Sequence, residues 1–247
     1  MVIVLTLGRS GSSMLMQSLK LLGMNVIGRD FDIKGSAISQ KKHEELNPKG
    51  YLEEPRIYYG GPASIEFQTL CQQNQYPSAC KMDIRHFTNT NQSKYWKNLA
   101  NDITSILVSY RDPSEQASSE HTASFQQDST IDAKEYFRFI SKFLMDYKNT
   151  YGCIDETLNK RLPSLRHKVY FIDYASAKKP QEYIAKLRSL TDIQPTQDQY
   201  HLAVSNISPK LFRVTHSSLS KEEIFWARKT GALDVYLELN EFRKAQE

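Results

Sequence analysis

The strongest constraint on this chain is an apolar run near its first residue that ends abruptly in a loop of small residues. Residues 2–7 (VIVLTL) form a continuous β-prone run, which is typical of a strand buried on both faces of a parallel sheet. The pattern breaks at residues 8–13, and from Ser12 the apolar positions fall near helical spacing until Gly23 offers a stop. The order strand, small-residue loop, helix indicates an α/β protein.

Further strand signals alternate with stretches long enough for helical crossovers. The predicted strands are residues 24–27, 79–84, 103–109 and 169–172, and long helices are predicted over residues 133–158, 180–191 and 221–245. We therefore predict an α/β fold of the P-loop type, with a central parallel sheet of about five strands flanked by helices. A chain of 247 residues with 40% hydrophobic content can bury such a core, and we expect residues 1–247 to form one domain.

Two segments do not follow this alternation. Residues 33–75 contain NPKGY and GGP clusters, which predict loop with short helices, and so long an irregular segment in a compact domain is typical of an element that covers the substrate. Residues 194–247 are predicted to be a C-terminal loop and helix. The polar part, residues 194–218, holds Pro195 and Pro209 and is expected to fold over one edge of the sheet.

The charge and cysteine content narrow the functional class. The 32 basic residues are interspersed with 28 acidic ones and the net charge is only +4, which favours an anionic small molecule over a nucleic acid. Cys71, Cys80 and Cys153 are widely spaced without zinc-site spacing, so free thiols in a reducing compartment are expected. The first apolar run is too short for a signal or a membrane span, and we expect a cytoplasmic protein.

The loop after the first strand has the composition of an anion site. Backbone amides and the positive end of the following helix can receive a phosphate there, glycines let the chain curl, and an arginine and two serine hydroxyls add donors. A tight turn with a serine helix cap is the simpler interpretation of the same residues. A nucleotide-triphosphate loop would need a lysine that is absent here. The proposed anion-binding residues are Gly8, Arg9, Ser10, Gly11, Ser12 and Ser13.

A second strand ends in a cation. The run ILVSY is followed by Arg111, and Pro113 can open a helix that reaches Ser119. Ligands of open α/β sheets bind at the carboxyl ends of the strands, so Arg111 and the first loop are expected to share a crevice. The competing interpretation is an Arg111 that pairs with Asp112 or a nearby helix and a Ser119 without a binding role.

These two segments resemble the donor-binding motifs of the sulfotransferase superfamily that uses 3′-phosphoadenosine 5′-phosphosulfate (PAPS). Residues 9–13 (RSGSS) are similar to its 5′-phosphosulfate loop, and Arg111 with Ser119 eight residues later is similar to its 3′-phosphate motif. Residues 47–53 (NPKGYLE) and 79–85 (ACKMDIR) resemble segments of bacterial members. Residues 169–174 (VYFIDY) resemble a later strand but depart from it at Asp173 and Tyr174, and residues 207–213 resemble a late element faintly.

The resemblance implies transfer of a sulfuryl group to a hydroxyl or amine, with 3′-phosphoadenosine 5′-phosphate (PAP) as the product and no metal. Charge builds on the departing 5′-phosphate, where Arg9 and Lys81 are the candidate stabilising cations. Glu53 is the preferred general base, although a solvated loop glutamate is an equally weighted interpretation. The other candidate bases are Glu54, Asp83, His86 and His121.

Two other functions fit parts of the pattern. A small-molecule kinase or nucleotide phosphotransferase would need the missing loop lysine and an acidic metal ligand, whereas a non-catalytic nucleotide-binding module would keep Arg9 and Arg111 without needing Glu53 or Lys81. Aromatic residues of the long insertion suit a small-molecule, carbohydrate or lipid acceptor, or internal packing. The acceptor and the oligomeric state are left open. These aromatic residues are Tyr51, Tyr58, Tyr59, Phe67 and Tyr76.

Overall fold

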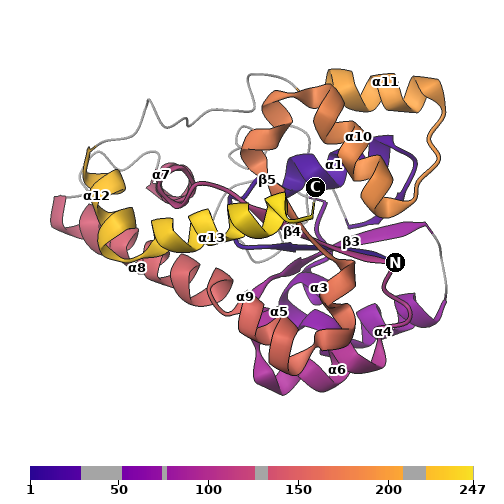
Figure 1. The fold of residues 1–247 in the computed structure, drawn as a ribbon, viewed down its shortest axis with the longest axis horizontal. Helices are drawn as coiled ribbons and strands as arrows, with labels where there is room; N and C mark the ends of the chain where they lie inside the picture. Colours follow the sequence, from indigo (N-terminus) through magenta and orange to yellow (C-terminus); the bar gives the residue numbers. More distant parts are fainter. Residues whose placement is uncertain (29–51, 74–76, 126–132, 208–220, 247) are drawn as a thin grey trace.

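The computed structural model describes residues 1–28, 52–73, 77–125, 133–207 and 221–246. Their architecture is α/β, with one five-stranded sheet in the order β2-β3-β1-β4-β5 and helices on both sides (Figure 1). Every neighbouring pair of strands runs parallel. The predicted parallel sheet of about five strands is therefore confirmed, and each predicted strand has its counterpart.

The elements follow one another in the alternation that the sequence predicts. The strands are β1 (Val2–Thr6), β2 (Asn25–Ile27), β3 (Ser78–Asp83), β4 (Ser105–Tyr110) and β5 (Val169–Asp173). The α-helices are α1 (Ser12–Leu21), α3 (Pro55–Gly60), α4 (Ile65–Gln72), α5 (Arg85–Thr88), α6 (Ser93–Asn98), α7 (Pro113–Phe125), α8 (Ala133–Tyr151), α9 (Ile154–Glu156), α10 (Pro180–Thr191), α11 (Gln197–Asn206), α12 (Lys221–Lys229) and α13 (Ala232–Lys244). Short 3-10 helices are η1 (Gly61–Ala63), η2 (Thr90–Gln92), η4 (Pro163–Lys168) and η5 (Tyr174–Lys178), and η3 (Thr157–Arg161) is a π-helix.

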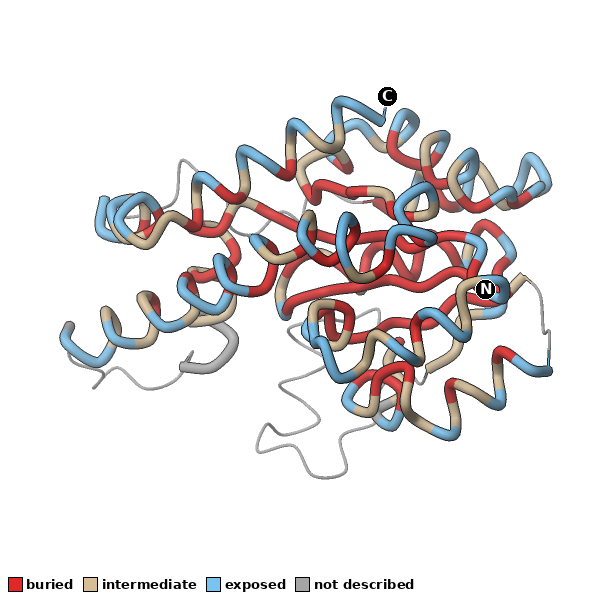
Figure 2. The backbone as a smooth tube through the Cα atoms, turned by 60° about the horizontal axis from the view of Figure 1, so that its bottom comes forward, coloured by how far each residue is buried: buried red, intermediate tan, exposed pale blue. Residues whose placement is uncertain are grey.

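The sheet divides the core into two layers. Successive side chains of a strand point to opposite faces, so in β1 Ile3 and Leu5 join one apolar cluster while Val2 and Val4 join the other. The first cluster includes side chains of α4, α6, α8 and α13, and the second includes those of α1, α10 and α11. Figure 2 shows the consequence, a sheet whose backbone is almost entirely buried between exposed helix surfaces. Burial on both faces explains the continuous apolar run of β1.

Three predictions of secondary structure are corrected. The helix predicted over residues 221–245 is interrupted, because Gly231 has a φ of 76° and caps the N-terminus of α13 in a left-handed conformation. The polar segment predicted as irregular contains α11, whose start is fixed by a capping box between Thr196 and Gln199. The predicted helix over residues 133–158 ends as α8 at Tyr151 and continues through α9 and η3.

The predicted long insertion is described only in part. Within residues 52–73 it forms the short helices α3, η1 and α4, in agreement with the expectation of short helices. Residues 33–51 and 74–75, including the NPKGY cluster, lie outside the described residues, as does Tyr76.

Candidate functional site

The candidate site lies at the carboxyl edge of the sheet, around the end of β1. The chain leaves β1 for α1 on one face of the sheet, and β1 has β3 and β4 as its neighbours. The connections after β1 and β4 lead to strands on opposite sides of the sheet, since β2 lies beyond β3 and β5 lies beyond β4. In open α/β sheets such a reversal creates the crevice where ligands bind. The predicted loop and Arg111 both follow the carboxyl ends of strands at this reversal.

The loop after β1 adopts an unusual backbone conformation. Arg9 has a φ of 64° and Gly11 a φ of 90°, so two of its residues lie in the left-handed region. Gly11 is the N-cap of α1, and a glycine has no side chain with which to cap the first amides of the helix. The amides of Ser12 and Ser13 therefore begin α1 without an intrahelical partner, at the positive end of its dipole. This geometry suits an anion.

The side chains behind the loop hold its backbone in place. Ser10 is fully buried, and its hydroxyl lies 2.6 Å from the hydroxyl of Thr6 and donates to Ser109 Oγ at 3.2 Å. Gln116 of α7 donates from Nε2 to the carbonyl oxygen of Gly8 at 2.6 Å. Ser10 is thus placed for loop rigidity, whereas Ser12 and Ser13 are the serines at the helix start.

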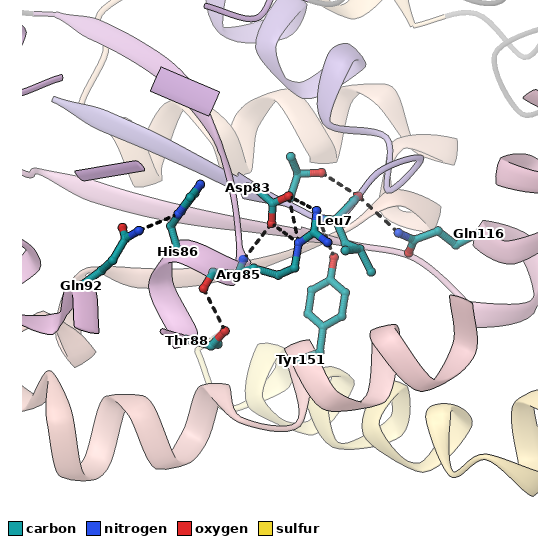
Figure 3. Close-up of polar contacts among 9 residues, drawn as sticks. Leu7, Asp83, Arg85, His86, Thr88, Gln92, Gln116 and Tyr151 are labelled. Atoms are coloured by element: carbon teal, nitrogen blue, oxygen red, sulfur yellow. Dashed lines mark hydrogen bonds and ion pairs between the residues drawn. The ribbon is translucent and has the colours of Figure 1, made fainter. Parts of the chain in front are cut away.

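Figure 3 shows how the last residue of the apolar run is held. Gln116 also donates to the carbonyl oxygen of Leu7 at 3.3 Å, and the amide of Leu7 donates to the hydroxyl of Tyr151 at 3.4 Å. Tyr151 in turn donates to the carbonyl oxygen of Ser109 at 2.7 Å. Helices α7 and α8 therefore fix the point at which β1 enters the loop. Sequence reasoning missed both Gln116 and Tyr151.

Tyr174 is a site residue that sequence reasoning missed. A Cβ placed on Gly11 would lie 2.1 Å from Tyr174 Cδ2, so the ring packs directly against the loop backbone. The guanidinium carbon of Arg111 lies 4.5 Å from the centre of the same ring. Tyr174 thus contacts both the loop and Arg111. The departure of Tyr174 from the family's strand pattern was the available signal.

The two predicted anion-binding segments meet at Arg9. Its Nε donates to Ser119 Oγ at 3.3 Å, although 110 residues separate the two in the chain.

Arg111 is 5% exposed at the end of β4, and its Nε forms an ion pair with Glu115 Oε2 at 3.0 Å. The helix pairing that the sequence left open for Arg111 is therefore present. Asp112 accepts from the amides of Ser114 and Glu115, so it caps α7.

Lys81 and Glu53 form an ion pair on the other side of β1. Lys81 Nζ lies 2.6 Å from Glu53 Oε1 and 3.5 Å from Ser13 Oγ, to which it donates. The Lys81 side chain is 2% exposed and that of Glu53 is 28% exposed. Burial lowers the pKa of Lys81; Glu53 opposes this shift, and the positive charge of Arg9 adds to it. The predicted residues Arg9, Ser13, Lys81 and Glu53 are therefore brought together.

The position of Glu53 depends on a close backbone contact. Gly28, just after β2, has a φ of 147°, and a Cβ placed on it would lie 2.7 Å from the amide nitrogen of Glu53. The absence of a side chain at Gly28 lets residues 52–53 pass beside the end of β2. This contact is made between segments that no local pattern connects.

The rival bases are engaged in other contacts. Glu54 accepts a hydrogen bond from the amide of Arg56 and caps α3. Asp83 accepts hydrogen bonds from Nε and Nη2 of Arg85 at 3.0 and 2.5 Å (Figure 3). His86 Nδ1 lies 2.9 Å from Gln92 Nε2. Each of these groups has a contact within its own segment, whereas Glu53 contacts Lys81.

Two groups of α7 complete the description. His121 packs edge-on against Tyr136 at 4.5 Å between ring centres, and burial lowers the pKa of its imidazole. Glu120 was not predicted as a site residue, yet its Oε2 lies 3.6 Å from the position of a Cβ on Gly8. Burial raises the pKa of Glu120, while Arg9 opposes the shift. The carboxyl group of Glu120 therefore lies beside the loop that follows β1.

No cluster of three or more potential metal-ligating His, Cys, Asp or Glu side chains is found in the ranges that the structure describes. Among these same ranges, none of the helices combines the length and the apolar character that a membrane crossing requires. Neither models of protein families nor curated proteins give a significant match to this chain.

Proposed function

We propose that this protein is a sulfotransferase that uses PAPS and transfers its sulfuryl group to a hydroxyl or amine. The observation that carries the proposal is the hydrogen bond between Arg9 and Ser119. It joins the loop that resembles a 5′-phosphosulfate site to the helix that resembles part of a 3′-phosphate site. A nucleotide with anionic groups at both ends would contact both segments.

The residues around the loop fit such a nucleotide. The first amides of α1, the serine hydroxyls and the Arg9 guanidinium supply donors for one anionic end, and Arg111 with Ser119 supplies donors for the other. The loop has no lysine at the position that a nucleotide-triphosphate loop requires. Both features favour a PAPS site over an ATP site.

The residues on the β3 side suit the transfer step. The donor supplies an activated sulfuryl group, and negative charge builds on its phosphate oxygen as the bond to sulfur breaks. Lys81 and Arg9 act as fixed cations that stabilise this charge. Glu53 takes the proton of the acceptor, and its ion pair with Lys81 keeps the carboxylate near the loop.

A cytoplasmic location belongs to the same proposal. Cys71, Cys80 and Cys153 are free thiols, as expected in a reducing compartment. Burial raises the pKa of Cys71 to about 11, so this thiol is unreactive at neutral pH.

Slow hydrolysis of PAPS without an acceptor tests the proposal. We expect the wild-type chain to release sulfate and PAP, and we expect Arg9→Ala to lower the rate roughly 100-fold because a cation at the leaving phosphate is lost. Arg56→Ala is the matched control, since Arg56 is an exposed arginine paired with Glu66. Equal rates in wild type and Arg9→Ala, or no hydrolysis by the wild type, would remove the support for the proposal.

A second comparison tests the base once an acceptor has been found by screening with labelled donor. Glu53→Gln should lower turnover roughly 100-fold and leave the Kd of PAP within about threefold of wild type. Glu54→Gln, one residue along the chain, is expected to retain turnover because Glu54 caps α3. Unchanged turnover in Glu53→Gln would exclude Glu53 as the base.

A further inference from the structure

The carboxylate of Glu115 is an unexpected neighbour for a phosphate-binding arginine. Its Oε2 lies 3.0 Å from Arg111 Nε, and the side chains of Arg111 and Glu115 are 6% and 13% exposed. A negative charge at this distance, screened little by solvent, lowers the positive potential that Arg111 presents to an incoming phosphate. The feature is therefore costly for a site that binds an anion.

Local structure does not account for Glu115. The cap of α7 is already supplied by Asp112, which accepts hydrogen bonds from the amides of Ser114 and Glu115. A buried ion pair contributes little net stability, because the loss of hydration of both ions offsets most of their attraction. Neither capping nor stability requires a carboxylate at this position.

Orientation of Arg111 does not depend on Glu115 alone. The guanidinium stacks on the ring of Tyr174 at 4.5 Å, and the ring is itself fixed against Gly11. A neutral glutamine in place of Glu115 would keep an oxygen acceptor for Arg111 Nε. The distinctive property of Glu115 is thus its charge.

We propose that Glu115 is a specificity-determining counter-ion that reduces the preference of this site for adenine nucleotides with a 3′-phosphate over those with a 3′-hydroxyl. The inference rests on the proposed function. An arginine accommodates a phosphate on a ribose, whereas a carboxylate accepts hydrogen bonds from ribose hydroxyls and repels a phosphate. A site that holds both groups discriminates less steeply than one that holds the arginine alone. The weaker hold on the 3′-phosphate favours release of PAP.

Calorimetric titration of the full chain with PAP and with adenosine 5′-phosphate tests this inference. We expect Glu115→Gln to tighten PAP binding about tenfold, equivalent to about 1.4 kcal/mol, and to change the Kd of adenosine 5′-phosphate by less than about twofold. Glu182→Gln is the matched control, because Glu182 also lies in the first turn of a helix and pairs with a basic residue, Lys179, but at the surface. In Glu182→Gln, the ratio of the Kd of adenosine 5′-phosphate to the Kd of PAP should equal that of the wild type.

The outcomes separate the inference from the function on which it rests. The counter-ion role predicts that Glu115→Gln raises the ratio of the Kd of adenosine 5′-phosphate to the Kd of PAP. If this ratio stays constant or falls, the counter-ion role is overturned and Glu115 is assigned to positioning Arg111. Glu115→Ala provides a second variant, in which the counter-ion role again predicts tighter PAP binding and a positioning role predicts weaker binding. If neither wild type nor variants bind PAP, the proposed function fails, and the inference fails with it.

Discussion

Two cation–carboxylate pairs, each with a buried cation, lie on opposite sides of β1, and they are built in different ways. Lys81 is an interior residue of β3, and its partner Glu53 comes from a segment 28 residues earlier in the sequence. Arg111 follows β4 directly, and its partner Glu115 is one turn further along α7. The first pair exists only after the sheet and the segment beside β2 have assembled, whereas the second is local to one helix start.

The chemical difference between the cations matches the roles proposed for the two sides. An arginine keeps its charge at every accessible pH and offers a planar fork, so it suits binding of a fixed phosphate. A lysine changes its pKa readily when buried, and burial lowers the pKa of Lys81. The β4 side is therefore suited to holding the nucleotide and the β3 side to the step in which charge moves.

The largest expected effect comes from removing the carboxylate of the β3 pair. Glu53→Ala leaves Lys81 buried without its counter-ion and should lower the free energy of unfolding by about 3 kcal/mol. Lys81→Met should cost less, about 1 kcal/mol, because Glu53 is partly exposed and can be hydrated. Urea denaturation checks the order, and the double variant should resemble Lys81→Met. A larger loss in Lys81→Met than in Glu53→Ala would contradict the account.

The loss in Glu53→Ala should depend on pH in a definite direction. Burial keeps the folded-state pKa of Lys81 below its ordinary value of 10.5, so between the two values the folded chain binds fewer protons than the unfolded chain. The free energy of unfolding therefore rises with pH in that interval. Because Glu53 raises the pKa of Lys81, the interval begins at a lower pH in Glu53→Ala. The difference in the free energy of unfolding between wild type and variant should therefore shrink as the pH is raised from 7 towards 10. A deficit that grows over this range would show that Lys81 is not the source.

A substitution on the β4 side should change the affinity for the nucleotide, and a substitution on the β3 side should change the rate of transfer. Arg111→Ala should weaken PAP binding roughly 10- to 100-fold, the range for lost hydrogen bonds to a charged group, with less than about threefold change in the rate of PAPS hydrolysis at saturation. Lys81→Met should show the reverse pattern. Titration with PAP and single-turnover hydrolysis separate the two quantities, and equal effects in both variants would erase the distinction between the sides.

The sequence predicted the elements better than the contacts between them. Strands buried on both faces are continuous apolar runs, so β1 and β5 were readable directly from composition. The helix break at Gly231 was missed because apolar residues recur with helical spacing on both sides of it. The motifs named Arg9 and Ser119, and these two residues lie in contact in the structure.

The missed contacts have two kinds of cause. The Glu53–Lys81 pair and the packing of Tyr174 on Gly11 join distant segments, and no local pattern states which side chains meet after folding. The Arg111–Glu115 pair has the i, i+4 spacing of helical ion pairs and was available from the sequence. Its significance depends on burial, which only the structure supplies.

Tyr174 offers a smaller test of how the loop and the β4 side are coupled. Tyr174→Leu removes the ring over which Arg111 lies and should weaken PAP binding about fivefold, in line with about 1 kcal/mol for a cation–π contact. Tyr174→Phe keeps the ring and should bind PAP as the wild type does. Titration with PAP gives both values, and an equal loss in Tyr174→Phe would implicate the hydroxyl instead of the ring.

The smallest expected effect concerns Glu120 beside the loop. Burial raises the folded-state pKa of this carboxyl group, so its stabilising contribution is present at low pH and is lost as the pH rises through the raised value. Glu120→Gln should therefore raise the Tm by about 1–2 °C at pH 7 and have almost no effect at pH 4. Calorimetric scans at the two pH values check this, and a lower Tm at pH 7 would indicate that attraction to Arg9 dominates.

The central claim is that the loop and the β4 side together bind a nucleotide with anionic groups at both ends. Thermal unfolding of the wild-type chain with PAP, and separately with ATP and magnesium, tests it most directly. At about 100 times its Kd, PAP should stabilise the fold by about 2.7 kcal/mol and raise the Tm by roughly 5–10 °C, with ATP and magnesium giving a much smaller shift. Stabilisation by ATP and magnesium without any effect of PAP would contradict the account.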